Sequence, residues 1–292
     1  MSTNPIDLNK RALLGLLGAG IQASRSPSMY EREAEANRIR CLYQIIDLEV
    51  LHLEMDSIPE LLTAAERMGF VGINVTHPCK QAVMSFLTET SEDAREIGAV
   101  NTVLFRDGKR VGFNTDWIGF FNSFRSGLPN AALNRVVQLG AGGAGAATAY
   151  ALLKLGARRI VLFERDEAKA TALIERLSSI FGAGCISNGS SLEHALQAAD
   201  GVVHATPIGM HGHPGTAVPA QLLRSQLWVA EVVYFPRETQ LLKHARAIGC
   251  RSLDGTGMVI NQATAAFQLF FGRPADRERM SRHFEDNDGD GR

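Results

Sequence analysis

Three glycines at a fixed spacing could bind a pyrophosphate. The segment Gly140-Ala-Gly-Gly-Ala-Gly145 directly follows an apolar run, Arg135–Leu139, and precedes a helical pattern at Ala146–Leu155. Read as G-x-G-x-x-G, its first glycine allows a tight turn, Gly142 lets backbone amides approach the phosphates, and Gly145 permits close helix–strand packing. The following helix N-terminus adds N–H groups and a positive dipole end. The pattern predicts a dinucleotide site, and a glycine-rich turn without a ligand is the alternative.

An acidic residue follows at the distance expected for a ribose contact. Glu164 ends the next apolar run, Arg159–Phe163, 24 residues after Gly140. A carboxylate there can accept hydrogen bonds from the hydroxyls of an adenosine ribose, whereas a 2′-phosphate would meet a like charge. The pattern therefore favours NAD as the cofactor. NADP stays possible because Arg165 could partly neutralise a phosphate, and Glu164 could also be a solvated residue at a strand end.

Short apolar runs alternate with helical patterns along most of the chain, which is typical of strand–helix–strand units and a parallel sheet. Strands are expected at Leu13–Leu17, Leu42–Ile46, Val71–Val75, Thr102–Phe105, Val111–Phe113, Arg135–Leu139, Arg159–Phe163, Gly201–Ala205, Trp228–Val233 and Cys250–Leu253. Helices are expected at Ile58–Arg67, Lys80–Leu87, Ala146–Leu155 and Met258–Phe271, among others. The fold class predicted is α/β.

The chain of 292 residues exceeds the usual size of one domain. Because the strand–helix pattern restarts near Asn130, we expect an α/β domain at residues 1–116 and a doubly wound, Rossmann-type dinucleotide-binding domain at residues 117–255. The C-terminal segment, residues 256–292, is expected to pack back on the first domain. An active site would then lie in the cleft between the domains.

Composition and charge argue against several classes of partner. Lys and Arg number 30 against 31 Asp and Glu, for a net charge of -1, which is untypical of proteins that bind nucleic acid or anionic membranes. No apolar run approaches the roughly 18 residues of a membrane span, and the first eleven residues lack a signal-peptide core. The four scattered cysteines form no disulfide framework, which favours a cytoplasmic protein.

Two segments imitate metal sites without completing one. Asp286-Asn-Asp-Gly-Asp-Gly291 starts like a calcium loop, but the chain ends at Arg292 without the glutamate of the twelfth position. His211 and His213 lie two residues apart, and the sequence offers no further ligands at a zinc-like spacing. We therefore predict that the protein holds no metal.

Polar residues gather in short motifs that occur in one order along nearly the whole chain. The motifs are Ser24-x-Ser26-Pro27, Asn74-Val-Thr-x-Pro-x-Lys80, Gly98-Ala-Val-Asn-Thr102, Asn114-Thr-Asp116, Gly140-Ala-Gly-Gly-Ala-Gly145, Ala205-Thr-Pro-x-Gly-Met210 and Asp254-Gly-x-Gly-Met-x-x-x-Gln262. Each has an ordinary structural explanation: Ser26 and Asp116 suit helix N-caps, and Lys80 suits a surface charge. Together the motifs resemble the shikimate dehydrogenase family, and within it the quinate/shikimate dehydrogenase branch.

The resemblance implies a reversible oxidation of shikimate or quinate to the 3-dehydro ketone with a nicotinamide cofactor, and a substrate-binding role for the N-terminal domain. It implies that Lys80 and Asp116 are catalytic. The substrate pocket would be lined by Ser24, Ser26, Asn74, Thr76, Asn101, Tyr234 and Gln262. The cofactor would contact Gly140, Ala141, Gly142, Gly143, Ala144, Glu164, Arg165, Thr206, Met210, Val233 and Gly257.

The implied chemistry suits these two side chains. Oxidation of a secondary alcohol removes a hydride and a proton, so a base must lie near the hydroxyl. A lysine in water keeps its proton at neutral pH, so Lys80 would need a dry cleft, and Asp116 would hold it in place. The reverse assignment of the two roles stays open. So do aminoshikimate or another cyclic polyol as the substrate, and a non-catalytic ligand sensor with the same fold. The sequence indicates no oligomeric state.

Overall fold

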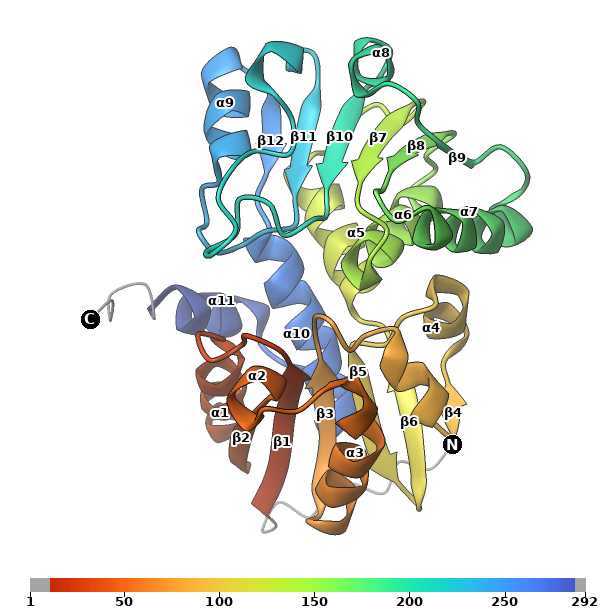
Figure 1. The fold of residues 1–292 in the computed structure, drawn as a ribbon. Coiled ribbons are helices and arrows are strands. Elements are labelled where there is room, and N and C mark those ends of the chain that lie inside the picture. Colours follow the sequence, from red (N-terminus) through yellow and green to blue (C-terminus); the bar gives the residue numbers. More distant parts are fainter. Residues whose placement is uncertain (1–10, 287–292) are drawn as a thin grey trace. The chain divides into compact units, whose positions relative to one another are not determined.

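The computed structural model describes residues 11–286 (Figure 1). The chain divides into two compact units, Met1–Thr115 with Ile260–Arg292, and Asp116–Val259. Each unit contains a six-stranded sheet. The N-terminal segment considered above as a signal peptide lies almost wholly outside the described residues, as does the calcium-like tail after Asp286.

The sheet of the first unit is mixed, with the strand order β2-β1-β3-β5-β6-β4. Strands β2, β1 and β3 run parallel, β5 pairs antiparallel with both β3 and β6, and β4 runs parallel to β6. The five strands expected here are confirmed within two residues at each end. The strands are β1 (Arg11–Gly18), β2 (Arg40–Asp47), β3 (Phe70–Val75), β4 (Glu89–Thr90), β5 (Thr102–Arg106) and β6 (Lys109–Phe113).

One helix of the first unit lies where the sequence predicts it. The helix expected at Ile58–Arg67 is confirmed: Pro59 lies in its first turn, and its buried residues Ile58, Leu62 and Ala65 repeat at helical spacing. The elements are α1 (Ser26–Ala36), α2 (Leu48–Leu51), η1 (Met55–Ser57), α3 (Ile58–Arg67), η2 (Ala82–Phe86), α4 (Glu92–Ile97) and α11 (Arg277–Asp286).

Two local expectations in this unit are wrong. Ser26 is the first helical residue of α1, and Arg25 occupies the N-cap position without a side-chain cap. The helix expected at Lys80–Leu87 is a turn followed by the short 3-10 helix η2. The Lys80 carbonyl accepts the Val100 N–H at 2.8 Å, so it is bonded to a distant segment instead of to a following helical turn.

The sheet of the second unit has the order β12-β11-β10-β7-β8-β9, and every neighbouring pair is parallel. The central strands are buried along their whole length, as expected for a sheet covered on both faces. Five expected strands are confirmed within two residues at each end, whereas the three-residue β9 was not predicted. The strands are β7 (Val136–Leu139), β8 (Ile160–Phe163), β9 (Ile186–Asn188), β10 (Gly201–His204), β11 (Trp228–Glu231) and β12 (Arg251–Leu253).

Helices connect these strands as in a doubly wound fold. The helix expected at Ala146–Leu155 begins three residues earlier, inside the glycine motif, and nine of its twelve residues are buried. The helices are α5 (Asp116–Gly127), α6 (Gly143–Lys154), α7 (Glu167–Phe181), α8 (Leu192–Gln197), the 3-10 helix η3 (Ala220–Leu222), and α9 (Gln240–Ile248).

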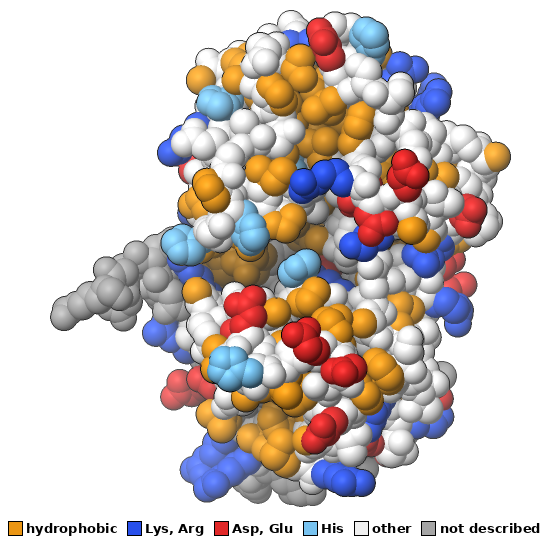
Figure 2. Space-filling view, viewed as in Figure 1, with side chains coloured by type: hydrophobic (Ala, Val, Ile, Leu, Met, Phe, Trp, Pro, Cys, Tyr) orange, Lys and Arg blue, Asp and Glu red, His pale blue; other side chains and the backbone are white. Residues whose placement is uncertain are grey.

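Helix α10 (Thr256–Phe271) starts in the second unit and continues into the core of the first. The Tyr30 ring lies 6.4 Å from that of Phe267 and 6.1 Å from that of Phe270. A methyl group at Gly72 of β3 would lie 2.6 Å from Phe270, so glycine is required where this ring packs on the sheet. None of the helices within residues 11–286 has the length and apolar character needed to cross a membrane. Figure 2 shows side chains of both charge signs on the visible face of each unit.

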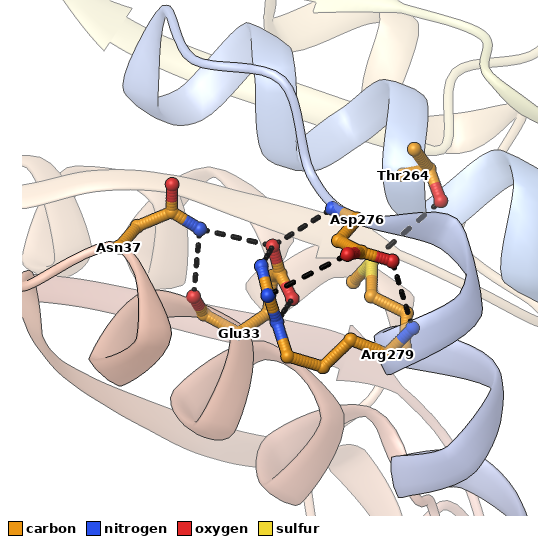
Figure 3. A network of polar contacts seen from close by, with 6 residues as sticks. Glu33, Asn37, Thr264, Asp276 and Arg279 are labelled. Carbon is orange, nitrogen blue, oxygen red and sulfur yellow. Dashed lines mark hydrogen bonds and ion pairs between the residues drawn. The ribbon is translucent and has the colours of Figure 1, made fainter.

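A buried carboxylate joins α11 to α1 (Figure 3). Glu33 of α1 is fully buried, and the Arg279 guanidinium donates two hydrogen bonds to it, at 2.7 and 2.8 Å. The backbone N–H of Asp276 and the Asn37 amide each donate a further bond at 2.9 Å. The hydrogen bond to Glu33 also raises the pKa of Arg279 above its ordinary value. The carboxylate is thus surrounded by donors from two elements more than 230 residues apart in sequence.

Replacement of Arg279 by Met should weaken the attachment of α11. The substitution leaves the buried Glu33 charge without its bidentate partner, a change that costs about 3 kcal/mol. Amide hydrogen exchange of α11, which reports the free energy of local opening, should accelerate accordingly. Arg282 lies exposed on the same helix, so Arg282→Met is the matched control and should change protection by less than about 0.5 kcal/mol. Equal effects of the two substitutions would contradict the role of this ion pair.

Candidate functional site

The glycine motif forms a turn that only glycine allows at two positions. Gly140 has φ +103°, and a methyl group there would lie 2.6 Å from the Ala205 carbonyl oxygen. A methyl group at Gly145 would lie 2.2 Å from the Gly140 carbonyl oxygen, which explains the third glycine. At Gly142, by contrast, a methyl group would meet no atom within 4 Å. The N-terminus of α6 is therefore open beside Gly142, and its first N–H groups can bind a phosphate.

Glu164 lies against this turn. Its Oε2 accepts the Ala141 N–H at 2.8 Å, and its Oε1 accepts the N–H groups of Arg165 and Asp166 at 2.7 and 3.1 Å. A carboxylate has about four lone-pair positions, so it can still accept a ligand hydroxyl. Asp166 caps α7 by accepting from the N–H groups of Ala168 and Lys169. The structure thus brings Glu164, Arg165 and the glycine turn together.

Four further residues expected at the cofactor lie in the second unit. Thr206 is partly buried just after β10, and a methyl group at Gly140 would lie 3.1 Å from its Cγ2. Met210 follows on the same loop and is 39% exposed. Val233 is buried after β11, and a methyl group at Gly257 would lie 2.3 Å from Ser123 Oγ, so Gly257 is a close-packing position. Tyr234, expected at the substrate, also belongs to this unit and is 37% exposed.

Three residues expected at the substrate converge in one hydrogen-bond network in the first unit. Asn101 is buried, and its Nδ2 donates to the Thr115 hydroxyl at 2.9 Å and to Gln262 Oε1 at 3.3 Å. Asn74 Nδ2 donates to the Asn101 carbonyl at 3.3 Å and to the Thr102 hydroxyl at 3.1 Å. Among the described residues the network uses only the carbonyl oxygen of Gln262, which leaves its amide N–H groups for a ligand oxygen.

The loop after β1 carries Ser24 and leads into Ser26, the first residue of α1, and Asp47 holds this loop. Asp47 is buried at the end of β2 and accepts the N–H groups of Gly20 and Ile21, each at 2.9 Å. It also accepts from the Gln22 amide and the Glu49 N–H. Burial alone would raise the pKa of Asp47, but these four hydrogen bonds together hold it below the ordinary value. The carboxylate is therefore a fixed anchor for the serine loop.

The turn that carries Thr76 and Lys80 lies beside the serine loop. Its backbone is bonded to the end of β1 twice: Thr76 N–H donates to the Leu17 carbonyl at 2.8 Å, and Ala19 N–H donates to the His77 carbonyl at 3.0 Å. Lys80 is partly buried at the end of the turn. Its carbonyl accepts the Val100 N–H, so the turn is also tied to the residue next to Asn101.

The same network positions Asp116 through its sequence neighbour Thr115. It is buried and begins α5, directly after Thr115. The N–H of Thr115 donates to Asn101 Oδ1 at 2.7 Å, which fixes the backbone immediately before Asp116.

Sequence reasoning missed four residues of this site. Asp47, Thr102, Thr115 and Tyr43 were not predicted as site residues, although Thr102 ends the motif Gly98-Ala-Val-Asn-Thr102. The Tyr43 hydroxyl donates to Asn74 Oδ1 at 2.9 Å. Thr115 lies inside the motif Asn114-Thr-Asp116, so its position in that motif was an available signal. Tyr43 and Asp47 lie in β2 without any local signal. Within residues 11–286, no group of three or more His, Cys, Asp or Glu side chains could hold a metal ion.

Two family models match the chain. The model described as the shikimate dehydrogenase substrate binding domain matches residues 16–103, and the shikimate 5′-dehydrogenase C-terminal domain matches residues 255–282. Shikimate dehydrogenase (NADP(+)) of Streptomyces avermitilis is 52% identical over 92% of this chain and 93% of the relative. Quinate/shikimate dehydrogenase (NAD(+)) of Corynebacterium efficiens is 48% identical over 93% of this chain and 97% of the relative.

A solved structure has the same fold. Quinate dehydrogenase from Corynebacterium glutamicum in complex with NAD superposes with a TM-score of 0.87, at 44% identity, over 95% of this chain and 100% of that one. The arrangement of sheets and helices described above is therefore that of a known group of two-domain α/β proteins, with an N-terminal substrate-binding domain and a Rossmann-like domain.

The anchoring of the serine loop by Asp47 should depend on pH. Because the folded-state pKa of Asp47 is lowered, its contribution is fully present above the ordinary carboxyl value of about 4 and is lost as pH falls through the folded value. At pH 7, Asp47→Asn should lower the protection of the Gly20 and Ile21 amides against hydrogen exchange by about 2 kcal/mol. The difference between wild type and variant should shrink below about pH 4.

The exposed Asp56 of η1 provides the control for this prediction. Asp56→Asn should leave the protection of Gly20 and Ile21 unchanged at every pH. A difference for Asp47→Asn that stays constant down to pH 2, once corrected for intrinsic exchange rates, would contradict the role of the carboxylate charge.

Proposed function

The chain belongs to the shikimate dehydrogenase family, and we propose that it oxidises shikimate or quinate reversibly to the 3-dehydro ketone, with NAD as the preferred cofactor. The observation that carries the proposal is the network of Asn74, Asn101 and Gln262. These residues are up to 188 positions apart in sequence, yet they meet beside the turn that ends in Lys80. Such a group of amides suits the ring hydroxyls of a small polyol acid.

The first unit supplies the groups for a hydroxylated carboxylate. Ser24 lies on the loop held by Asp47, and Ser26 begins the helix that follows it. The hydroxyls of both can donate to a carboxylate. Thr76 and the N–H groups of Gln262 can bind ring hydroxyls. Because the loop and the turn are bonded to each other through Ala19 and His77, these donors are held in place before the substrate arrives.

We assign proton transfer to Lys80 and its orientation to Asp116. When bound, the nicotinamide ring supplies the hydride acceptor. Lys80 then takes the hydroxyl proton during oxidation and returns it during reduction. Asp116 accepts a hydrogen bond from an N–H of Lys80, as an amine before the transfer and as an ammonium after it, and so holds this nitrogen at reaction distance from the hydroxyl.

The second unit suits a dinucleotide. The open position at Gly142 admits the pyrophosphate at the N-terminus of α6, where Gly143 and Ala144 add N–H groups. Glu164, beside Ala141, accepts from the adenosine ribose hydroxyls, which disfavours a 2′-phosphate. Relatives with either cofactor are similar to this chain, so the preference rests on Glu164 itself.

The proposal is tested by steady-state assays of shikimate, quinate and aminoshikimate, each with NAD and NADP at millimolar substrate. Turnover of shikimate or quinate supports the proposal. Turnover of aminoshikimate alone would move the substrate to another member of the class. If shikimate binds without turnover under any condition, the proposed enzymatic function is wrong and the protein is a ligand sensor.

Lys80→Ala should lower kcat by about 10²- to 10⁴-fold, because an acid–base group contributes on that scale. The dissociation constant of NAD should change less than about threefold. A small primary amine such as ethylamine added to the assay should restore part of the lost rate in Lys80→Ala but none in Asp116→Asn, because only the former lacks the proton-transfer group.

The exposed Lys109 serves as the control, because it forms an ion pair with Glu89 on the edge strand β4. Lys109→Ala should keep kcat within twofold of the wild type. If Lys80→Ala retains a third of the wild-type turnover, or if the amine rescues Asp116→Asn instead, the assignment of Lys80 is wrong.

Glu164→Gln should shift the cofactor preference toward NADP. The substitution keeps the shape of the side chain and removes the charge that repels a 2′-phosphate, so the ratio of kcat/KM for NAD to that for NADP should fall about tenfold. Glu167→Gln, in the exposed first turn of α7, is the matched control and should leave the ratio unchanged. A wild-type preference for NADP, or equal ratios in both variants, would refute the role given to Glu164.

A further inference from the structure

A chain of buried polar side chains crosses the carboxyl edge of the second sheet. His204 ends β10 and Glu231 ends β11, and the two are register partners on these parallel strands. His204 Nδ1 lies 2.8 Å from Glu231 Oε1, and its Nε2 lies 2.5 Å from the Thr206 hydroxyl. His204 is 0% and Glu231 2% exposed. The proton transfer assigned to Lys80 and Asp116 does not involve these three polar side chains.

The partners of Glu231 determine which nitrogen of His204 carries hydrogen. The Val233 N–H donates to Glu231 Oε1 at 3.1 Å. Thr239 Oγ accepts the Leu242 N–H, so its own hydrogen is donated to Glu231 Oε2 at 3.0 Å. Both oxygens therefore act as acceptors, and Nδ1 must donate to the carboxylate. In the neutral ring Nε2 is then the acceptor, and it takes the hydrogen of the Thr206 hydroxyl.

Thr206 lies at the point in the strand order where sheets of this type bind a dinucleotide. Strand β7 pairs with β8 on one side and β10 on the other, so the order of connection reverses between β7 and β10 (Figure 1). Ligands bind at such a point, outside the carboxyl ends of the strands. Glu164, after β8, marks the adenosine side, so the nicotinamide half extends toward β10. Thr206 follows β10 and lies beside Gly140 of the phosphate turn.

We propose that His204, held by Glu231, is a positioning residue that fixes the Thr206 hydroxyl as a hydrogen-bond acceptor toward the nicotinamide half of the cofactor. The hydrogen of Thr206 is committed to Nε2, and the Ile208 N–H contacts its oxygen only weakly, at 3.4 Å. One lone pair remains, and it accepts from a donor of the cofactor, either the carboxamide N–H or a ribose hydroxyl. This role rests on the proposed cofactor binding.

The test measures NADH binding to the full chain without substrate, by fluorescence titration. Thr206→Val removes the acceptor. His204→Asn keeps a donor near the Nδ1 position for Glu231 but is too short to reach Thr206. Each variant should weaken NADH about tenfold, and the double variant should be no weaker than either single one, because both remove the same hydrogen bond. Effects that multiply, or wild-type affinity in His204→Asn, would overturn the proposal.

Two controls distinguish failure of the proposed His204–Thr206 hydrogen bond from failure of the proposed function. His194→Asn, at an exposed histidine, should bind NADH within twofold of the wild type. Nitrogen-15 NMR of the protein without cofactor should show His204 protonated at Nδ1 and unprotonated at Nε2. Protonation at Nε2 at neutral pH would overturn the proposed role of His204. If the wild type binds neither NADH nor NADPH while this NMR pattern is found, the proposed function fails instead.

Discussion

The carboxyl ends of parallel strands meet at one edge of a sheet, because each strand runs in the direction of its neighbours. In the first unit this constraint gathers the loops after β1, β2 and β3. In the second unit it gathers the loops after β7, β8, β10 and β11. Ser24, Thr76, Lys80, the glycine turn, Glu164 and Thr206 follow one of these strands, whereas Asn101, Asp116 and Gln262 come from other elements. The two units therefore solve the same problem, which is to hold loops still at one edge of a sheet.

Carboxylates hold those loops: Asp47 and Glu231 are buried, and Glu164 is partly buried. Asp47 accepts two N–H groups of the serine loop, and Glu164 accepts the Ala141 N–H of the glycine turn. Glu231 does the same for the Val233 N–H after β11. A loop N–H removed from water needs an acceptor, and an ionised carboxylate is a stronger one than a carbonyl. The same principle operates away from the site at Glu33, which accepts the Asp276 N–H and thereby attaches the C-terminal helix.

The glycines that a local turn requires were predictable from the sequence. Gly145 is required by its contact with the Gly140 carbonyl of the same motif, and Gly140 by its φ of +103°, although Gly140 also packs against the distant Ala205 carbonyl. Apolar runs located ten strands within two residues. For the central strands β7, β10 and β11 the reason is burial on both faces, which needs continuous apolar residues. The errors occurred where a local signal competed with a distant partner. The segment Lys80–Leu87 has a helical pattern, but the Lys80 carbonyl accepts the N–H of Val100, twenty residues further on.

The sequence by itself determined the fold class, the dinucleotide turn and the ordered motifs that identify the family, because these depend on residues close together in the chain. Only the tertiary structure decided which polar residues act as anchors. Asp47, Tyr43 and His204 have ordinary surroundings in sequence, and their partners lie on other strands or loops. A polar side chain in a strand has the same pattern whether it faces water or a buried donor. Strand register decides between the two, and register is set by long-range pairing that no local segment contains.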